Sequence, residues 1–439
     1  MFVSSLTLEN QVSKGVRSEG RRSPHLKINS KIVTFSLKYH LYFFEKLCYN
    51  KEHIHMCSIK ATPKFKQLKQ SYGFDDVAIV PGDVTINPDQ TNTDFKIGDF
   101  TFSIPFMASA MDSVVDVKLA IQLNKLGGLG VLNLDGIQAR YTNPDEILEE
   151  LAKTSDANVT ALLQKIYREP IKDNLVGDRV SQIKKAGAIA AISLVPANTK
   201  RLAPIVQEAG GDILVIQSTV TSARHISKSY RGLIFSELCK QTKMPIVVGN
   251  CVSYTACLEL MQTGIAGVLV GVGPGAACTS REVLGIGVPQ ITATIDCAAA
   301  RNTFEKETGR YIPIITDGGL RKGGDICKSF AAGTDAVMIG SPFAQTKEAP
   351  GRGYHWGMSH PHPALPRGTR IKVGTTTTLE KLLFGPTSVV HGTENFVGAL
   401  RTAMGFCGAA NIREMHNADM VIAPALSTEG KFYQMTQKV

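Results

Sequence analysis

The sequence predicts an α/β protein built as a single parallel (β/α)8 barrel, the TIM-barrel architecture, over residues 56–439. Eight short apolar runs, each ending in small or polar residues, have the length and composition of buried parallel strands. Amphipathic segments of helix length, including Arg201–Glu208, Tyr254–Gln262 and Asp325–Ala332, separate most of these runs. The first run lacks the GxGxxG fingerprint of an open dinucleotide-binding sheet, so we favour closure into a barrel.

The eight predicted strands are spaced along the chain as strand–helix units. Their bounds are Ile104–Ala110, Leu129–Leu134, Ala188–Val195, Ile213–Ser218, Pro245–Asn250, Gly267–Val272, Ile312–Asp317 and Ala336–Ser341. Beyond the last strand, five apolar residues fall on one face of a helix, which we interpret as the eighth barrel helix. They are Phe396, Val397, Leu400, Met404 and Cys407.

Two segments interrupt the regular spacing. The first, Asp135–Gly187, lies between the second and third strands and contains a helical stretch at Pro144–Lys153. It is too short for a second globular domain of ordinary size. The other, at about 351–383, follows the eighth strand and is rich in Gly, His, Pro and Thr. A long irregular segment beyond the active end of a barrel is typically a lid, and a surface loop is the alternative.

Residues 1–55 form a basic extension, with nine Lys and Arg against four Glu and a net charge of +5. Their Ser and Arg content is typical of an organelle transit peptide, whereas the Glu residues argue against one. A disordered extension or a mis-assigned start, with Met56 as the natural first residue, is the interpretation we favour. The fold prediction excludes this segment in either case.

The net charge of +10 does not indicate a nucleic-acid-binding protein, because half of it lies in residues 1–55. The remaining mild excess suits an anionic small molecule. The sequence has neither a helix-turn-helix pattern nor a basic strip with interleaved aromatic residues. A run of about 18 apolar residues, which a membrane span requires, is also absent, so we expect no membrane partner.

Cysteine usage indicates a reducing compartment, which we take to be the cytoplasm. The nine cysteines form an odd count without a CxxC pair or regular spacing. Disulfide frameworks and zinc sites usually show such spacing. We therefore predict reduced thiols, with neither a disulfide framework nor a zinc site.

The most informative stretch is GVGPGAACTS, residues 271–280, directly after the sixth predicted strand. Its three glycines allow a sharp turn and a close approach of the backbone to a ligand. The turn delivers Cys278 to the end of the barrel that carries the chemistry. A buried, inert thiol is the alternative for a single cysteine, but the glycine context favours a nucleophile.

Two glycine turns predict a phosphate site. Asp317-Gly318-Gly319 ends the seventh strand and Gly340-Ser341 ends the eighth. Loops at these two positions of a barrel commonly bind phosphate through backbone N–H groups, although glycines also serve merely to turn a chain. Because the Asp317 carboxylate can accept hydrogen bonds from sugar hydroxyls, we expect a phosphorylated and ribosylated substrate.

From Phe74 onward the chain resembles the inosine-monophosphate (IMP) dehydrogenase and guanosine-monophosphate (GMP) reductase family. The branch it resembles is the short one, without the paired regulatory CBS domains, and the short insert after the second strand agrees. The matching blocks are Phe74–Val77, Ile104–Asp112, Gly249-Asn250, GVGPGAACTS, Gly285–Gln290, Asp317–Gly319, Gly340-Ser341, Glu348–Gly351 and Gly357-Met358.

The resemblance implies that Cys278 adds to C2 of the hypoxanthine ring, that hydride leaves for NAD and that water hydrolyses the adduct. Ser280 stands where the family has a catalytic threonine. Arg367 is the candidate for the lid arginine that activates water, with a surface guanidinium as its alternative. The implied substrate-binding residues are Ser109, Met111, Asn250, Asp317, Gly318, Gly319, Gly340, Ser341, Gly357 and Met358.

The resemblance also implies two bound groups and an oligomer. Gln217, Ser218, Gly271 and Gly273 match cofactor-binding positions for NAD. The backbone carbonyls of Gly271, Gly273 and Cys278 match a potassium site, and Glu429 is a further candidate ligand from a neighbouring subunit. A site shared in this way implies a homotetramer, or an octamer.

Three positions depart from the family pattern. Ala276 replaces a phosphate-binding serine, Gln217 replaces an aspartate at the nicotinamide, and Val373 falls where dehydrogenases have glutamine and reductases have a catalytic glutamate. We expect an NAD-dependent IMP dehydrogenase of guanine nucleotide synthesis. An NADPH-dependent GMP reductase and a catalytically silent purine-nucleotide-binding regulator are the alternatives.

Overall fold

Eight parallel strands close into a barrel in the computed structural model, which describes residues 67–226, 232–358 and 370–424. The barrel belongs to a compact unit that begins at Gln70, and residues 1–55 lie outside the described part. The strands are β4 (Phe106–Ala108), β5 (Leu129–Asn133), β6 (Ala191–Leu194), β7 (Ile213–Gln217), β8 (Ile246–Cys251), β9 (Gly267–Val270), β10 (Ile314–Asp317) and β11 (Ala336–Ile339). All eight fall within a predicted strand or overlap it, so the barrel prediction is confirmed.

Closure occurs between β11 and β4, and the other strands pair in chain order from β4 to β11. Val337 pairs with Phe106 across the closing seam, and Met107 pairs with Leu129 on the other side of β4. Most strand residues are fully buried because side chains fill the barrel on one side and helices cover it on the other.

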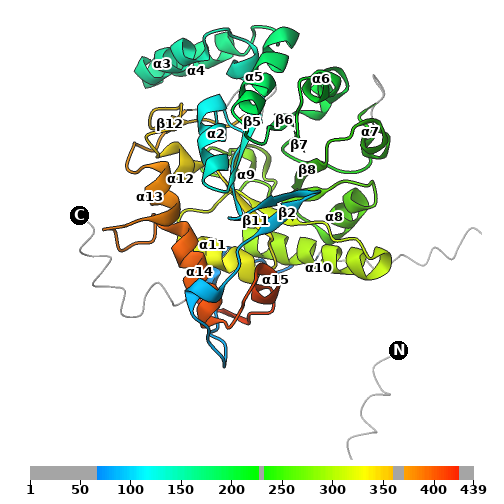
Figure 1. Ribbon diagram of the computed structural model, residues 1–439, viewed down its shortest axis with the longest axis vertical. Helices are drawn as coiled ribbons and strands as arrows, with labels where there is room; N and C mark the ends of the chain where they lie inside the picture. Colours follow the sequence, from blue (N-terminus) through cyan, green and yellow to red (C-terminus); the bar gives the residue numbers. More distant parts are fainter. Residues whose placement is uncertain (1–66, 227–231, 359–369, 425–439) are drawn as a thin grey trace, which may run out of the picture. The chain divides into compact units, whose positions relative to one another are not determined.

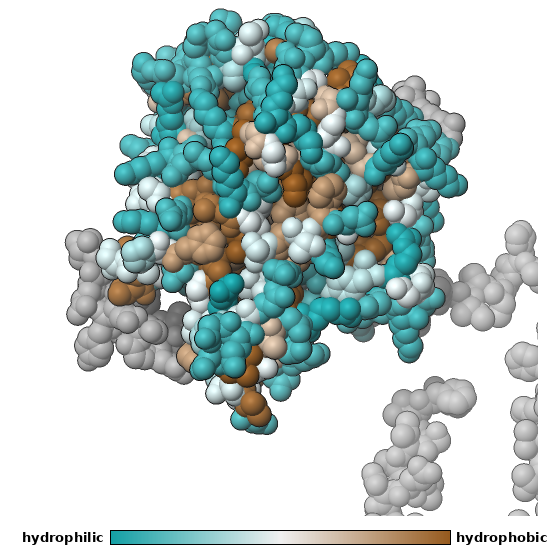
Figure 2. Space-filling model, viewed as in Figure 1, coloured by the Kyte–Doolittle hydropathy of each residue, from teal (hydrophilic) through white to brown (hydrophobic). Residues whose placement is uncertain are grey.

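Helices surround the strands (Figure 1). They are α2 (Val117–Lys125), α5 (Asp173–Lys185), α6 (Pro196–Glu208), α7 (Phe235–Gln241), α8 (Tyr254–Met261), α10 (Gln290–Thr308), α11 (Gly323–Ala331) and α14 (Phe396–Phe406). The predicted eighth helix is α14, in which four of the five predicted apolar residues are buried and Cys407 is half-buried at the C-terminal cap. Hydrophilic residues dominate the periphery of the face seen in Figure 2, as amphipathic outer helices require.

Side-chain caps mark where these helices begin. The carboxylate of Asp116 accepts a 2.7 Å hydrogen bond from the backbone N–H of Leu119 at the start of α2. Asn395 does the same for Gly398 at the start of α14, at 3.1 Å. Such caps satisfy N–H groups that have no partner within the helix, which is why polar residues stand directly before these apolar segments.

Small elements outside the barrel join segments that are distant in sequence. Strands β2 (Phe95–Ile97) and β3 (Phe100–Phe102) form a hairpin next to the start of β8. Strands β1 (Val77–Ile79) and β14 (Met420–Ile422) pair antiparallel and join the early and the late parts of the described chain. Within the described residues, no helix combines the length and apolarity that crossing a membrane would require.

The insert after β5 contains α3 (Pro144–Lys153), α4 (Asp156–Ile166) and α5. The first matches the predicted helical stretch, and α3 and α4 lie outside the helix ring in Figure 1. Their apolar faces form a small cluster of their own with Trp356. The indole of Trp356 donates a 2.8 Å hydrogen bond to the Tyr167 hydroxyl, which donates one of 2.6 Å to Asp112. The insert therefore packs against the segment that follows the last strand.

The predicted lid is described at both ends, and 359–369 lie outside the described residues. Strands β12 (Tyr354–His355) and β13 (Ile371–Lys372) form an antiparallel pair, and α13 (Leu379–Phe384) follows them. The described part is thus less irregular than its composition suggested. The reason is a set of apolar residues that the fold buries: Trp356, Leu379, Leu382 and Leu383.

Candidate active site

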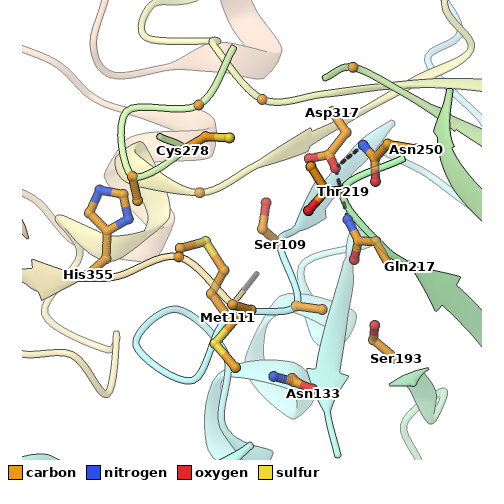
Figure 3. A pocket seen from close by; sticks show the side chains of 18 of the residues that line it. Ser109, Met111, Asn133, Ser193, Gln217, Thr219, Asn250, Cys278, Asp317 and His355 are labelled. Atoms are coloured by element: carbon orange, nitrogen blue, oxygen red, sulfur yellow. Dashed lines mark hydrogen bonds between the residues drawn. The ribbon is translucent and has the colours of Figure 1, made fainter. Parts of the chain in front are cut away.

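A cavity of about 740 Å³ opens at the carboxyl ends of the barrel strands. Every strand lines it with a residue at its last position or one position away, which explains why residues so distant in sequence converge here. These are Ser109, Asn133, Ser193, Gln217, Asn250, Gly271, Asp317 and Gly340. Figure 3 shows several of these side chains directed toward a shared space. A cavity of this size accommodates a nucleotide-sized ligand.

The loop after β9 places Cys278 in this cavity. Gly271 and Gly273 have φ angles of +149° and +79°, which side-chain-bearing residues rarely adopt. A Cβ on Gly271 would also lie 2.2 Å from the carbonyl oxygen of Asp317. The glycines are therefore required both for the turn and for the close approach of this loop to the end of β10.

The Cys278 thiol is half-buried and has a hydroxyl neighbour. Its Sγ donates a hydrogen bond of 3.3 Å to the Oγ of Ser280, which is buried at the start of α9 (Ser280–Leu284). Ser280 does not line the cavity itself, so its contact with the ligand space runs through Cys278. A half-buried thiol that lines the cavity, with a hydroxyl hydrogen-bonded to it, suits a nucleophile that adds to an electrophilic carbon.

Asp317 is held by amides from two other strands. Its Oδ2 accepts hydrogen bonds of 2.8 Å from Asn250 on β8 and 2.9 Å from Gln217 on β7. Burial raises the pKa of Asp317 to about 6, while the hydrogen bonds from Asn250 and Gln217 act in the opposite direction. Asn250 and Gln217 thus hold the carboxyl group in place at the cavity wall.

The predicted phosphate turns lie on the same wall. Gly318 and Gly319 have φ angles of +89° and +80°. A Cβ on Gly319 would sit 3.0 Å from the Cβ of Pro274, so the loops after β9 and β10 are in contact. Gly340 precedes Ser341, the first residue of α12 (Ser341–Ala344). Backbone N–H groups at such glycine turns bind phosphate well.

His355 is a lining residue that the sequence analysis missed. Its Nε2 lies 3.2 Å from the Oγ of Ser341, and its side chain is almost fully buried. Burial lowers the pKa of His355 to about 4, so the imidazole is neutral at pH 7. The signal was its place two residues before the matching Gly357-Met358 pair. Because neutral imidazole both donates and accepts, His355 can orient Ser341 toward an anionic group.

Gly357 and Met358 also line the cavity. A Cβ on Gly357 would be 3.0 Å from the carbonyl oxygen of Ala277, so this segment closely approaches the loop.

Val373 is half-buried against the core, and its carbonyl oxygen accepts a 3.1 Å hydrogen bond from Gln345. The candidates Arg367 and Glu429 lie outside the described residues.

A polar wall from β5, β6 and β7 was also missed. It adjoins Gln217 and Ser218, two of the predicted cofactor-binding residues, and makes room for a second ligand. Its signal was the single polar residues at or just after the ends of the second, third and fourth predicted strands, such as Asn133, Ser193 and Thr219. Its further members are Asn133, Asp135, Arg140, Ser193, Asn198 and Thr219.

The backbone carbonyl oxygens predicted to bind potassium are free to act as metal ligands. Among the described residues, the carbonyl oxygens of Gly271, Gly273 and Cys278 accept no hydrogen bond, whereas that of Gly275 accepts one from the Cys278 N–H. Unpaired carbonyl oxygens are suitable ligands for a potassium ion. The three predicted positions therefore fit such an ion.

Comparison with known proteins decides the family. The model for the IMP dehydrogenase/GMP reductase domain matches residues 71–359. The chain belongs to the IMP dehydrogenase/GMP reductase family. An uncharacterised oxidoreductase of Mycolicibacterium smegmatis is 36% identical over 81% of this chain and 97% of its own length. An IMP dehydrogenase of Cryptosporidium parvum is 28% identical over 80% of this chain and 91% of its own.

A solved structure agrees with the family assignment. The crystal structure of an IMP dehydrogenase/GMP reductase-like protein from Corynebacterium glutamicum has a TM-score of 0.76 and 34% sequence identity. The match covers 81% of this chain and 95% of that one. The resemblance seen in the sequence blocks is therefore confirmed as family membership, and the protein is of an oxidoreductase family.

Proposed function

We propose that this protein oxidises IMP to xanthosine monophosphate with NAD, through a covalent bond to Cys278. The observation that carries the proposal is the position of the Cys278 thiol in one cavity with the glycine turns, Asp317 and a separate polar wall. Relatives named IMP dehydrogenase, such as that of Borreliella burgdorferi at 33% identity over 65% of this chain, support it.

Each part of the cavity has a task in this proposal. Gly319, Gly340 and Ser341 hold the phosphate, assisted by His355, and Asp317 accepts hydrogen bonds from the ribose hydroxyls. The purine ring is held against Cys278 by the remaining predicted substrate-binding residues, which are Ser109, Met111, Asn250, Gly318, Gly357 and Met358. This arrangement presents C2 of the ring to the thiolate.

The reaction balances as IMP, NAD⁺ and water giving xanthosine monophosphate, NADH and a proton. Cys278 Sγ forms a bond to C2, and NAD, when bound, would supply the acceptor for the hydride that C2 loses. Water then breaks the bond between C2 and Sγ and restores the thiol, with Arg367 as the proposed activating residue. Ser280 orients the thiol through its 3.3 Å contact. Gln217, Ser218, Gly271 and Gly273 contact the nicotinamide cofactor.

We also propose a potassium site, an oligomeric state and a cellular location. The carbonyl oxygens of Gly271, Gly273 and Cys278, with Glu429 of a neighbouring subunit, would hold a potassium ion. Val283, Leu284 and Ile286, all about half-exposed beside this loop, support contact between copies in a homotetramer or octamer. We place the protein in guanine nucleotide synthesis and in the cytoplasm; the free cysteines of the described residues agree with a reducing compartment.

The test is absorbance of the reduced nicotinamide with IMP and NAD in potassium buffer, beside GMP with NADPH. A rise in the first assay that Cys278→Ala abolishes and Cys239→Ala leaves intact supports the dehydrogenase. A fall in the second alone would replace it by GMP reductase. GMP reductase remains the alternative because the relatives at 35–36% identity are named only as oxidoreductases. Nucleotide binding without either change would indicate a silent regulator, in line with the substitutions at Gln217, Ala276 and Val373.

A further inference from the structure

Three cysteines that the proposed reaction does not use meet behind the active site. Cys251 ends β8, Cys257 lies in the first turns of α8, and Cys297 lies in the middle of α10. Their Sγ atoms all lie within 4.8 Å of one another. All three side chains are fully or almost fully buried, and all three thiols are free. We name this group the thiol cluster.

We propose that the thiol cluster is a binding site for one thiophilic metal cation of the Zn²⁺ class, held by the sulfurs of Cys251, Cys257 and Cys297. Zinc–sulfur bonds of about 2.3 Å place two tetrahedral sulfur ligands about 3.8 Å apart. The sulfurs therefore need to draw together by about 1 Å at most, a movement within reach of small χ1 rotations. Zn²⁺ and related soft cations favour such thiolate sets.

Oxygen atoms beside the cluster offer a fourth ligand. The Sγ of Cys297 lies 4.0 Å from the carbonyl oxygen of Ser253, the residue that caps α8. The Sγ of Cys257 lies 3.7 Å from the carbonyl oxygen of Cys297. The carbonyl oxygen of Ser253 already accepts a 3.0 Å hydrogen bond from the N–H of Cys257, and its second lone pair is the candidate for the fourth position of a tetrahedral site.

The charge of the bound cation itself would balance the thiolates. Arg301 lies one turn after Cys297 on α10, but its guanidinium is already paired with the carboxylate of Asp335 at 2.9 Å. A divalent cation held by the three sulfurs therefore supplies the main positive charge at this buried place.

The local sequence could not indicate this site, which is why we predicted no zinc site from cysteine spacing. Cys257 lies six positions after Cys251, and Cys297 lies forty positions after Cys257. Only the packing of α8 against α10 brings them together. Cysteine spacing identifies metal ligands that lie in one local sequence motif. It cannot identify ligands that come from three separate elements of a barrel.

A cation here would connect to the active site through the backbone. Cys251 directly follows Asn250, which holds Asp317, and its carbonyl oxygen accepts a 3.1 Å hydrogen bond from the N–H of Gly271. Binding would fix the end of β8 to α8 and α10. Metal that binds the folded protein also stabilises it by mass action.

The test uses Cd²⁺ as probe on the full chain in a Cys278→Ser background, so that the thiol of the active-site cavity does not compete. We expect one tightly bound equivalent with sulfur-to-metal charge-transfer absorbance. Cys257→Ala or Cys297→Ala should weaken that binding at least about a hundredfold, since loss of even a second-shell partner costs about 10–100-fold. The matched control Cys239→Ala, a half-buried thiol outside the cluster, should retain it.

Three results would overturn the proposal. One is unchanged Cd²⁺ affinity in both cluster variants. Another is X-ray absorption of the Zn²⁺-loaded protein, in the same Cys278→Ser background, that counts fewer than three sulfurs around the metal. The last is a disulfide between two cluster cysteines in the purified protein, detected by peptide mass spectrometry. The absorption measurement leaves the three cluster cysteines intact, so the proposal stays testable if the alanine variants do not fold.

Discussion

The side-chain amide of Asn250 donates a 2.8 Å hydrogen bond to Oδ2 of Asp317, joining β8 to β10 past the intervening strand β9. Gln217, from β7, donates a second bond of 2.9 Å to the same oxygen. Three strands thus converge on one carboxylate oxygen. Within the described residues, Oδ1 of Asp317 receives no such bond, so it is available to a ligand.

Nucleotide binding should weaken as the pH falls through the pKa of Asp317, which is about 6. Sugar hydroxyls donate to a carboxylate, so a ligand selects the ionised form, and below pH 6 deprotonation costs affinity, up to about tenfold per pH unit. Calorimetric titration of IMP at pH 5 to 8 measures this. Asp317→Asn should flatten that part of the profile, while the titration of the ligand phosphate remains in both proteins. Parallel profiles for the two proteins would contradict the role of Asp317.

Cys278→Ala should lower turnover by about a thousandfold or more, because the covalent step has no substitute nucleophile. The affinity for the monophosphate should change little, since the phosphate and ribose contacts remain. Steady-state kinetics and direct binding separate the two effects. Cys239→Ala, on α7 and away from the cavity, is the control and should keep normal turnover. Equal losses of binding and turnover in Cys278→Ala would show a structural thiol instead.

Gly271→Ala should destabilise the protein by on the order of 2–3 kcal/mol, through its φ of +149° and a Cβ placed 2.2 Å from the Asp317 carbonyl oxygen. Chemical denaturation gives the free energy of unfolding. Gly324→Ala is the matched control: its Cβ meets nothing within 4 Å, and its position in α11 tolerates alanine. We expect Gly324→Ala to be neutral or stabilising by about 0.4–1 kcal/mol. Similar losses in both variants would refute the steric argument.

His355 should make the protein less stable in acid. Burial lowers its pKa from 6.5 to about 4, so the unfolded chain binds more protons than the folded protein between these values. Stability contributed by the neutral ring is therefore complete above pH 6.5 and decreases as the pH falls toward 4, by on the order of 2 kcal/mol.

Free energies of unfolding at pH 7 and pH 4.5 measure this effect. His355→Gln should lose that part of the difference, whereas His391→Gln, at an exposed position, should keep it. An unchanged difference in His355→Gln would mean that the ring is solvated or already charged in the folded protein.

Strand and helix positions followed from the sequence because each depends on local pattern. An apolar run such as Gly267–Val270 can be recognised as a strand from its own residues and those next to it. The turns at Gly271 and Gly319 need glycine because their φ angles are positive. Eight such units leave few ways to bury all strands on both faces, so the barrel followed as well. The ends of the strands then brought Cys278, Asp317 and Ser341 to one cavity, as the fold class requires.

Other features depended on the docking of distant elements. The contact of His355 with Ser341, the bond between Trp356 and Tyr167, and the meeting of Cys251 with Cys297 arise from packing angles and strand register. No local pattern encodes these quantities, because a shift of one helix by a single turn leaves its apolar face intact and moves every polar neighbour. The sequence by itself therefore determined the barrel and the residues at its strand ends. The tertiary structure alone decided which side chains hold Asp317 in place and which three thiols meet behind it.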